Sequence, residues 1–242
     1  MILSRITRAL REQNWFAVAL EFVIVIAGVV IGFQVTEWNA DRIARQDEAL
    51  ILTRLETDYQ ELSDRIDWAI ERNIAIFDAL SRLMDVIQSE EPQPANPEQF
   101  RQDLDTAFTG VLGPLRSSTI VELTSAGNMN LIRDDTLRAN LLVLDESVQR
   151  TASLFDILDA GNRAIQAPFI STIIFENTIS ADGTPQTWGV IGADLETMRA
   201  NPAVLSTISM RRRNIAFMLD WLHRLRQDVD AMQTQIEAET TP

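Results

Sequence analysis

The sequence predicts an all-α protein with a transmembrane helix near its N-terminus, continuing into an antiparallel bundle of three to four long helices with short extra helices. Three observations predict this class. From Phe16 to Phe33, Glu21 is the only side chain that is not apolar. Residues 40–89 place apolar side chains at steps of three and four, which is typical of an amphipathic helix. Glycine and proline are sparse, and no stretch alternates with period two for long enough to predict a sheet.

The apolar run within residues 15–36 has the length of a membrane span. Its continuous apolar part rises about 27 Å as a helix, close to the thickness of the hydrocarbon core of a bilayer. Trp15 and Trp38, with Asn39 beside it, flank the run as interfacial anchors. The run is longer than the core of a typical secretory signal, and no small-residue cleavage site follows it. We therefore expect an uncleaved anchor, with a buried helix as the alternative.

Arginines bias the orientation expected for this helix. Arg5, Arg8 and Arg11 lie in a short basic segment, residues 1–14, together with the free amine. The opposite flank also carries arginines, diluted by acidic residues, so the bias is small. It favours a cytoplasmic N-terminus. The acidic helical domain, residues 37–242, is then expected in the periplasm, with the anchor in the bacterial inner membrane.

Local signals set the expected bounds of the first helices. No Gly or Pro occurs between Phe33 and Pro92, so the membrane helix is expected to continue into the first helix of the domain. A proline-rich stretch then ends this helix. Asn96 is expected to cap the next helix, with Pro97 at its first position, and this helix should reach about Thr109.

Glycines and capping residues divide the middle of the chain. Gly110 and Gly113 mark a second break. Thr119 stands at capping-box spacing from a glutamate and is expected to start a short helix. That helix should stop at Gly127, because glycine favours the left-handed position that ends helices.

Two more long helices are expected towards the C-terminus. One of the aspartates at 134–135 caps an apolar-periodic stretch that should run to Phe175, with a kink at Pro168. Residues 179–190 are expected to form a loop, since turn-forming residues gather there. A last helix should end near Glu239.

One face of the membrane helix combines an acid with small residues. At about 100° per residue, Glu21, Gly28 and Gly32 fall within about 40° of one line. The two glycines form a G-x-x-x-G motif, which lets helices approach closely in lipid, and an ionisable group in hydrocarbon normally faces protein. We expect Glu21, Gly28, Gly32 and Gln34 to form an intramembrane helix contact. Two alternatives remain for Glu21: it is protonated or snorkels without function, or it lines a cation or proton path.

Composition and motifs exclude many kinds of chemistry. With 35 acidic and 21 basic residues, the chain carries a net charge of −14, which argues against nucleic acid as a partner. There is no cysteine, and His223 is the only histidine, so di-iron sites and Cys/His zinc sites are excluded. No phosphate loop, dinucleotide fingerprint or calcium loop occurs. We therefore expect no catalytic residue, metal or cofactor, and no enzyme unless two buried acids share a cleft.

Arg211, Arg212 and Arg213 are the basic cluster of the domain. Consecutive helix residues point in three directions, so these arginines do not form one patch. We expect them to pair with acids on neighbouring helices, with an anionic partner as the alternative.

Two stretches resemble an uncharacterised bacterial family of small proteins with one N-terminal membrane helix. The matching positions of the first stretch are Glu21, Gly28, Gln34, Trp38 and Asn39. Those of the second are Gly127, Asn128, Leu131, Ile132, Leu137 and Arg138, while Ala126 stands where the family more often has Ser. The resemblance implies a bacterial membrane address and a helical domain, and it implies no activity.

These features predict a bitopic membrane protein that acts through protein–protein assembly. Its partner would be further copies of itself or another integral membrane protein, as an accessory subunit of a membrane complex. One alternative is an extracytoplasmic ligand-binding sensor, which a buried pocket with convergent polar groups would favour. Another is an ion-conducting oligomer with Glu21 in the path.

Overall fold

The computed structural model describes residues 15–108 and 115–240. The protein is mostly helical, as its sequence predicts. Its contacts form two compact units, Met1–Leu50 and Ile51–Pro242. The long helix α2 (Trp15–Gln88) contributes residues to both units.

Two sequence predictions concern residues outside the described ranges. The basic start of the chain comprises Arg5, Arg8 and Arg11, and the second break between helices is expected at Gly110 and Gly113. Both stay predictions.

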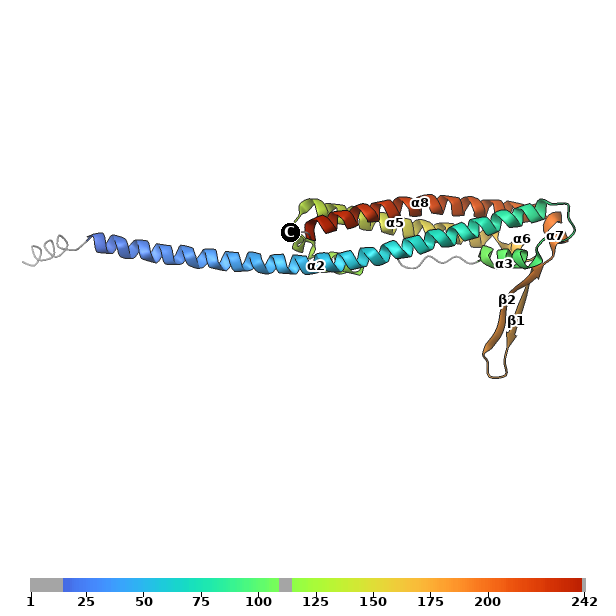
Figure 1. The fold of residues 1–242 in the computed structure, drawn as a ribbon, viewed down its shortest axis with the longest axis horizontal. Coiled ribbons are helices and arrows are strands. Elements are labelled where there is room, and N and C mark those ends of the chain that lie inside the picture. Colours follow the sequence, from blue (N-terminus) through green and yellow to red (C-terminus); the bar gives the residue numbers. More distant parts are fainter. Residues whose placement is uncertain (1–14, 109–114, 241–242) are drawn as a thin grey trace, which may run out of the picture. The chain divides into compact units, whose positions relative to one another are not determined.

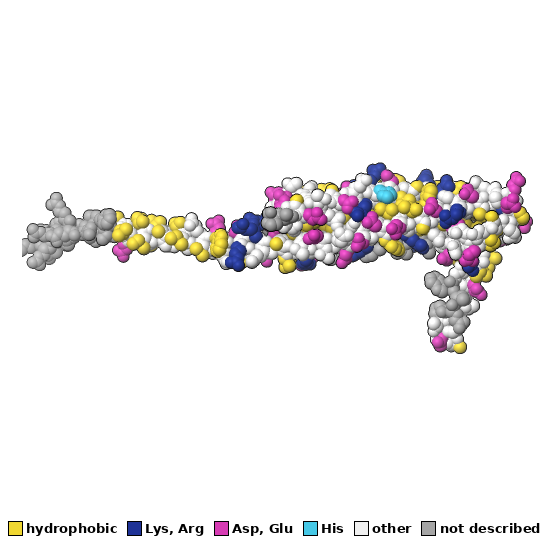
Figure 2. Space-filling view, in the orientation of Figure 1, with side chains coloured by type: hydrophobic (Ala, Val, Ile, Leu, Met, Phe, Trp, Pro, Cys, Tyr) yellow, Lys and Arg dark blue, Asp and Glu magenta, His cyan; other side chains and the backbone are white. Residues whose placement is uncertain are grey.

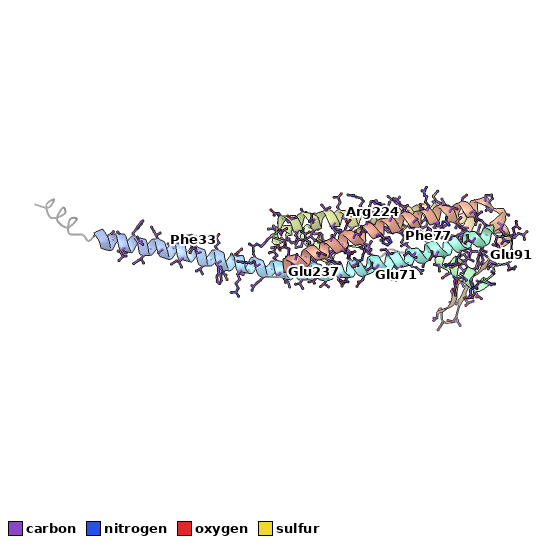
Figure 3. All side chains as sticks on the ribbon, turned by 45° about the horizontal axis from the view of Figure 1, so that its top comes forward. Phe33, Glu71, Phe77, Glu91, Arg224 and Glu237 are labelled. Atoms are coloured by element: carbon purple, nitrogen blue, oxygen red, sulfur yellow. The ribbon has the colours of Figure 1, made fainter. Side chains whose placement is uncertain are left out.

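The described part of the first unit is the N-terminal portion of α2. Its large apolar side chains between Val18 and Val35 are all exposed (Figure 2). Phe33, labelled in Figure 3, is 72% exposed. An 18-residue window here has a mean hydropathy of 2.4 and no buried residue. This helix is therefore long and apolar enough to cross a membrane.

Three long helices lie side by side in the second unit (Figure 1). They are the α2 residues from Ile51 onwards, α5 (Asp135–Ile165) and α8 (Pro202–Thr240). The shorter helices are α3 (Pro97–Phe108), α4 (Ser118–Ala126), the 3-10 helix η1 (Met129–Leu131), α6 (Ala167–Ile170) and α7 (Leu195–Ala200).

Side-chain contacts give the relative directions of the long helices. Asn140 bonds to Gln235, and Asn162 bonds to Asn214, so α5 and α8 run in opposite directions. The corresponding contacts between α2 and α8 join Gln60 to Gln233 and Asp67 to Arg226. Helices α2 and α5 therefore run in the same direction, each antiparallel to α8.

Buried apolar side chains form two clusters along the second unit. The first includes Leu55, Tyr59, Leu141, Leu222 and Val229. The second includes Ile76, Leu80, Leu104, Phe169 and Ile208. Burial of this apolar surface is the main favourable contribution to folding, so the two clusters hold the three long helices together.

Several predicted helix ends are confirmed. The Asn96 side chain accepts a hydrogen bond from the Gln99 N–H at 3.1 Å, and α3 begins at Pro97, directly after Asn96. Asp134 caps α5 by accepting a hydrogen bond from the Leu137 N–H. Gly127 ends α4 with φ 70°, a left-handed conformation that glycine adopts without a steric penalty.

The residue that caps the N-terminus of α4 is not the one predicted. Ser117, and not Thr119, is the N-cap, and its Oγ accepts a hydrogen bond from the Ile120 N–H at 3.2 Å. The Thr119 N–H instead donates to the Asp58 carboxylate of α2 at 2.8 Å. A distant carboxylate thus completes this helix terminus, which local spacing does not reveal.

The helix predicted to run to Phe175 and the loop predicted at 179–190 are each confirmed only in part, because a β-hairpin with its turn at 180–184 occupies residues 173–193. Helix α5 ends at Ile165, and strands β1 (Ile173–Ile179) and β2 (Pro185–Ala193) pair antiparallel (Figure 1). Only the first residue of β1 is buried. With neither face of that strand covered, the sequence carries no alternation of apolar and polar residues to signal it.

Candidate functional site

The face of α2 that is predicted to make an intramembrane helix contact is exposed. Glu21 is exposed, and a Cβ added at Gly28 or Gly32 would meet nothing within 4 Å. The Thr36 hydroxyl donates to the Gly32 carbonyl at 2.9 Å and so stays on its own helix. The backbone at both glycines is therefore accessible to another helix.

The other predicted membrane residues lie differently around α2. At about 100° per residue, Asn39 falls on the line of Glu21, whereas Gln34 lies about 140° away from it. One contact face therefore does not include Gln34. Trp38 is exposed, as an interfacial anchor would be, and the Trp15 side chain lies outside the described residues.

A second candidate site lies within the second unit, where polar side chains interrupt the core. On α2 the buried positions follow steps of three and four: Ile66, Ala69, Asn73, Ile76 and Leu80. Asn162 of α5 and Asn214 of α8 are also buried, and Arg211 of α8 is half-buried with its Nε buried. Polar residues on three helices thus replace apolar core residues. Burial of a polar group is costly unless the group is hydrogen-bonded or paired, so the partners of these side chains decide what they do.

Asn73, Asn162 and Arg211 border a hollow of about 510 Å³. Its buried walls come from both apolar clusters and include Ala69, Ile76, Phe155 and Ile215. The hollow therefore lies where one cluster gives way to the other. Its volume is within the usual range of small-molecule sites.

Two asparagines at the hollow are held by hydrogen bonds that leave part of each amide unused. The Asn214 amide donates to the Asn162 Oδ1 at 2.9 Å, and the Asn73 amide donates to the Ala69 carbonyl at 2.7 Å. Among the described residues, the Asn162 Nδ2 has no acceptor and the Asn73 Oδ1 has no donor. One further donor and one further acceptor are therefore available to a molecule in the hollow.

Arg211 provides a cation beside these amides. Its Nε is buried and has no hydrogen-bond partner among the described residues. Burial lowers the pKa of the Arg211 guanidinium, and the negative charge of Asp159 partly opposes this effect. A buried donor without an acceptor costs about 1–3 kcal/mol, so Arg211 is destabilising unless something pairs with it.

The expected ion pairs of the arginine cluster are not formed by Arg211, Arg212 or Arg213 within the described parts of the chain. Arg212 instead stacks over Phe77, with its guanidinium carbon 5.6 Å from the ring centroid. Arg213 is exposed. The three directions predicted for consecutive residues therefore give three different environments.

Exposed side chains form the mouth of the hollow. Trp68 is 54% exposed. Asp156 is also exposed, and Asp159 forms an ion pair with Arg163 at 2.9 Å. The mouth is thus polar and includes an aromatic ring, while the walls behind it are apolar.

The buried acids of the second unit have structural partners. Asp103 accepts a bidentate hydrogen bond from Arg82, with the shortest N···O distance 2.7 Å. Asp145 accepts one from Arg116, with both distances 2.9 Å. Each acid is therefore held by its own arginine, and no group of three or more potential ligands for a metal ion occurs in the described part of the chain. His223 is exposed on α8, at the surface seen in Figure 2.

No protein-family model, curated protein or solved structure matches this chain. The resemblance to the uncharacterised bacterial family stays a prediction. The function is therefore inferred from the residues of the chain itself.

The polar layer around Arg211 is the feature that sequence reasoning missed. Its signal was present, because Asn73 falls at an inward step of the α2 period. One asparagine at such a step is weak evidence. Asn73 becomes informative because Asn162 and Arg211 line the same hollow. Residues so far apart in the sequence can be related only through the fold.

Proposed function

We propose that this protein is a single-pass membrane protein that works by assembly within the bilayer. Residues 15–36 cross the bacterial inner membrane, and the helical domain lies in the periplasm. The face formed by Glu21, Gly28 and Gly32 contacts further copies of the chain or another integral membrane protein.

One observation carries this proposal: an exposed acid lies in line with two open glycines on an otherwise apolar helix segment. In hydrocarbon, an unpaired ionisable side chain costs several kcal/mol. A neighbouring helix that packs on Gly28 and Gly32 would cover Glu21 and supply it with a partner. Assembly therefore removes the main energetic cost of this segment.

The test is the mass of the intact full-length particle in mild detergent. We expect an assembly for the wild type and at least a tenfold weaker one for Gly28→Ile and Gly32→Ile, because the added side chains separate the helices. The matched control is Ala27→Ile, which adds similar bulk about 100° away on the helix. A monomeric wild type, or equal damage by the control, would overturn the proposal.

Glu21 variants separate assembly from ion conduction. Glu21→Leu should weaken assembly, whereas Glu21→Gln should largely preserve it, since an amide still forms interhelical hydrogen bonds. An ion path would instead show cation or proton flux in liposomes that Glu21→Gln abolishes. Such flux would favour the conducting oligomer.

The polar hollow favours a second candidate function, a periplasmic ligand-binding sensor. Convergent polar groups beside an apolar pocket are the usual features of a small-molecule site. Helix α2 carries both Asn73 at the hollow and the apolar segment, so a change at the hollow has a continuous helix along which to act. Any signal would then pass to a membrane partner.

A further inference from the structure

We propose that the hollow between α2, α5 and α8 binds a small organic monocarboxylate with an apolar body. This assignment rests on the second candidate function, ligand binding by the helical domain, and it names the chemical class of the ligand. It does not depend on assembly within the membrane.

The charges around the hollow favour a single negative charge on the ligand. Three arginines and two aspartates line it: Arg72, Arg163, Arg211, Asp156 and Asp159. Asp159 pairs with Arg163, whereas Arg211 forms no ion pair among the described residues, so Arg211 supplies one excess positive charge to a ligand. The whole chain has a net charge of −14, so this excess is a local reversal of sign. A phosphate group with two charges would exceed it, and an organic cation would add to it.

The unused hydrogen-bond donors fit a carboxylate. Arg211 presents an Nε–H without an acceptor, and the Asn162 Nδ2 likewise has no acceptor among the described residues. A planar guanidinium edge and a carboxylate form two parallel hydrogen bonds, and pairing with an ionised group makes such bonds stronger than neutral ones. Asn214 is a positioning residue here, because its bond to the Asn162 Oδ1 fixes the orientation of that amide.

The rest of the hollow fits an apolar body. Ala69, Ile76, Phe155 and Ile215 are each at most 5% exposed and line it. Transfer of apolar ligand surface from water onto such walls is favourable. Inorganic anions lack this surface, so an aromatic or aliphatic carboxylate is the better occupant.

The test uses benzoate as the probe and the full-length protein in detergent. Thermal unfolding is followed by tryptophan fluorescence at constant ionic strength. We expect 10 mM benzoate to raise the Tm of the helical domain by about 2–4 °C, because a ligand that binds only the folded state stabilises it. Benzamide, which has the same shape without the charge, and inorganic phosphate should each give no shift.

Variants assign the effect to the hollow. Arg211→Gln should weaken benzoate binding at least tenfold, and Asn162→Ala should weaken it less. The matched control is Arg213→Gln, on the same helix but exposed, which should bind as the wild type does. Should Arg211→Gln fail to fold, Asn162→Ala against Arg213→Gln gives the same comparison.

Each other outcome overturns a defined part of the proposal. A Tm rise with benzylamine or benzamide that Asn162→Ala removes, without one for benzoate, would reject the carboxylate class and keep ligand binding. No shift with any probe would reject both. Benzoate binding that Arg211→Gln and Asn162→Ala leave unchanged would place the site elsewhere. None of these results bears on intramembrane assembly.

Discussion

Arg211 combines a core-facing position with a charge that the described residues do not neutralise. Its Nε is buried without an acceptor, and burial lowers its pKa against the opposing charge of Asp159. Replacement of such a group by an apolar side chain of similar volume is often stabilising. A residue that opposes stability in the empty protein is typical of a binding site, where a ligand supplies the missing partner.

Arg211→Met should therefore raise the stability of the ligand-free domain. We expect a gain of about 1 kcal/mol, or roughly 2–4 °C in Tm, because the buried unpaired donor is removed and the apolar stem is kept. Thermal unfolding of the full-length protein measures it, with Arg213→Met as the exposed control. A clear loss of stability in Arg211→Met alone would mean that Arg211 holds the fold rather than a ligand.

Asp58, unlike Arg211, is a charged residue whose side chain has hydrogen-bond partners within the protein. Burial alone raises the pKa of this carboxyl, but hydrogen bonds from the Thr119 N–H and from the Ser117 and Ser118 hydroxyls together outweigh it and lower the pKa. The Ser117 hydroxyl donates at 2.7 Å. Asp58 thereby fastens the start of α4 to α2.

Asp58→Ala should destabilise the domain by about 1–2 kcal/mol at neutral pH, because the N-terminus of α4 loses its distant cap. The folded-state pKa lies below the unfolded value of 3.8, so this contribution is complete above that value and is lost as the pH falls through the folded pKa. The difference between wild type and variant should therefore shrink below about pH 4. Asp64→Ala, on the exposed side of α2, is the control.

At the scale of elements, local chemistry predicted the helix ends, whereas it did not predict the hairpin. Asn96, Gly127 and Asp134 act within a few residues of themselves, so their roles are readable in sequence. The strands β1 and β2 depend on each other, and the exposed face of β1 leaves no periodic pattern. The polar hollow likewise could not be predicted from local sequence patterns, because its residues come together only when α2, α5 and α8 pack.

The distal hairpin should contribute little to the stability of the helical core. Replacing residues 178–187 by a two-residue turn should change the Tm by less than about 2 °C, because the described side chains there are mostly exposed. Ile173→Ala should cost about 2 kcal/mol or more, since Ile173 belongs to the second apolar cluster. Equal losses in the two variants, measured by thermal unfolding, would show that the distal strands also support the core.

At the scale of the whole molecule, the protein joins an apolar helix segment to a strongly acidic helical unit. The segment has no buried residue in its most apolar window, whereas the second unit buries two apolar clusters of its own. The second unit buries its apolar clusters and is compatible with water, whereas the exposed apolar segment is compatible with the interior of a bilayer. A single-pass arrangement satisfies both, and the arginines before residue 15 favour a cytoplasmic N-terminus.

Single introduced cysteines test this arrangement, because the chain has none of its own. We expect Ser153→Cys, on the exposed side of α5, to react with a membrane-impermeant maleimide in intact spheroplasts. Ser4→Cys should react only after lysis, since the N-terminal segment is expected on the cytoplasmic side. The reverse pattern would invert the topology. Protection of both sites before lysis, with release of the protein from membranes by alkaline carbonate, would show that the apolar segment does not cross the bilayer, and intramembrane assembly through Glu21 would then be ruled out.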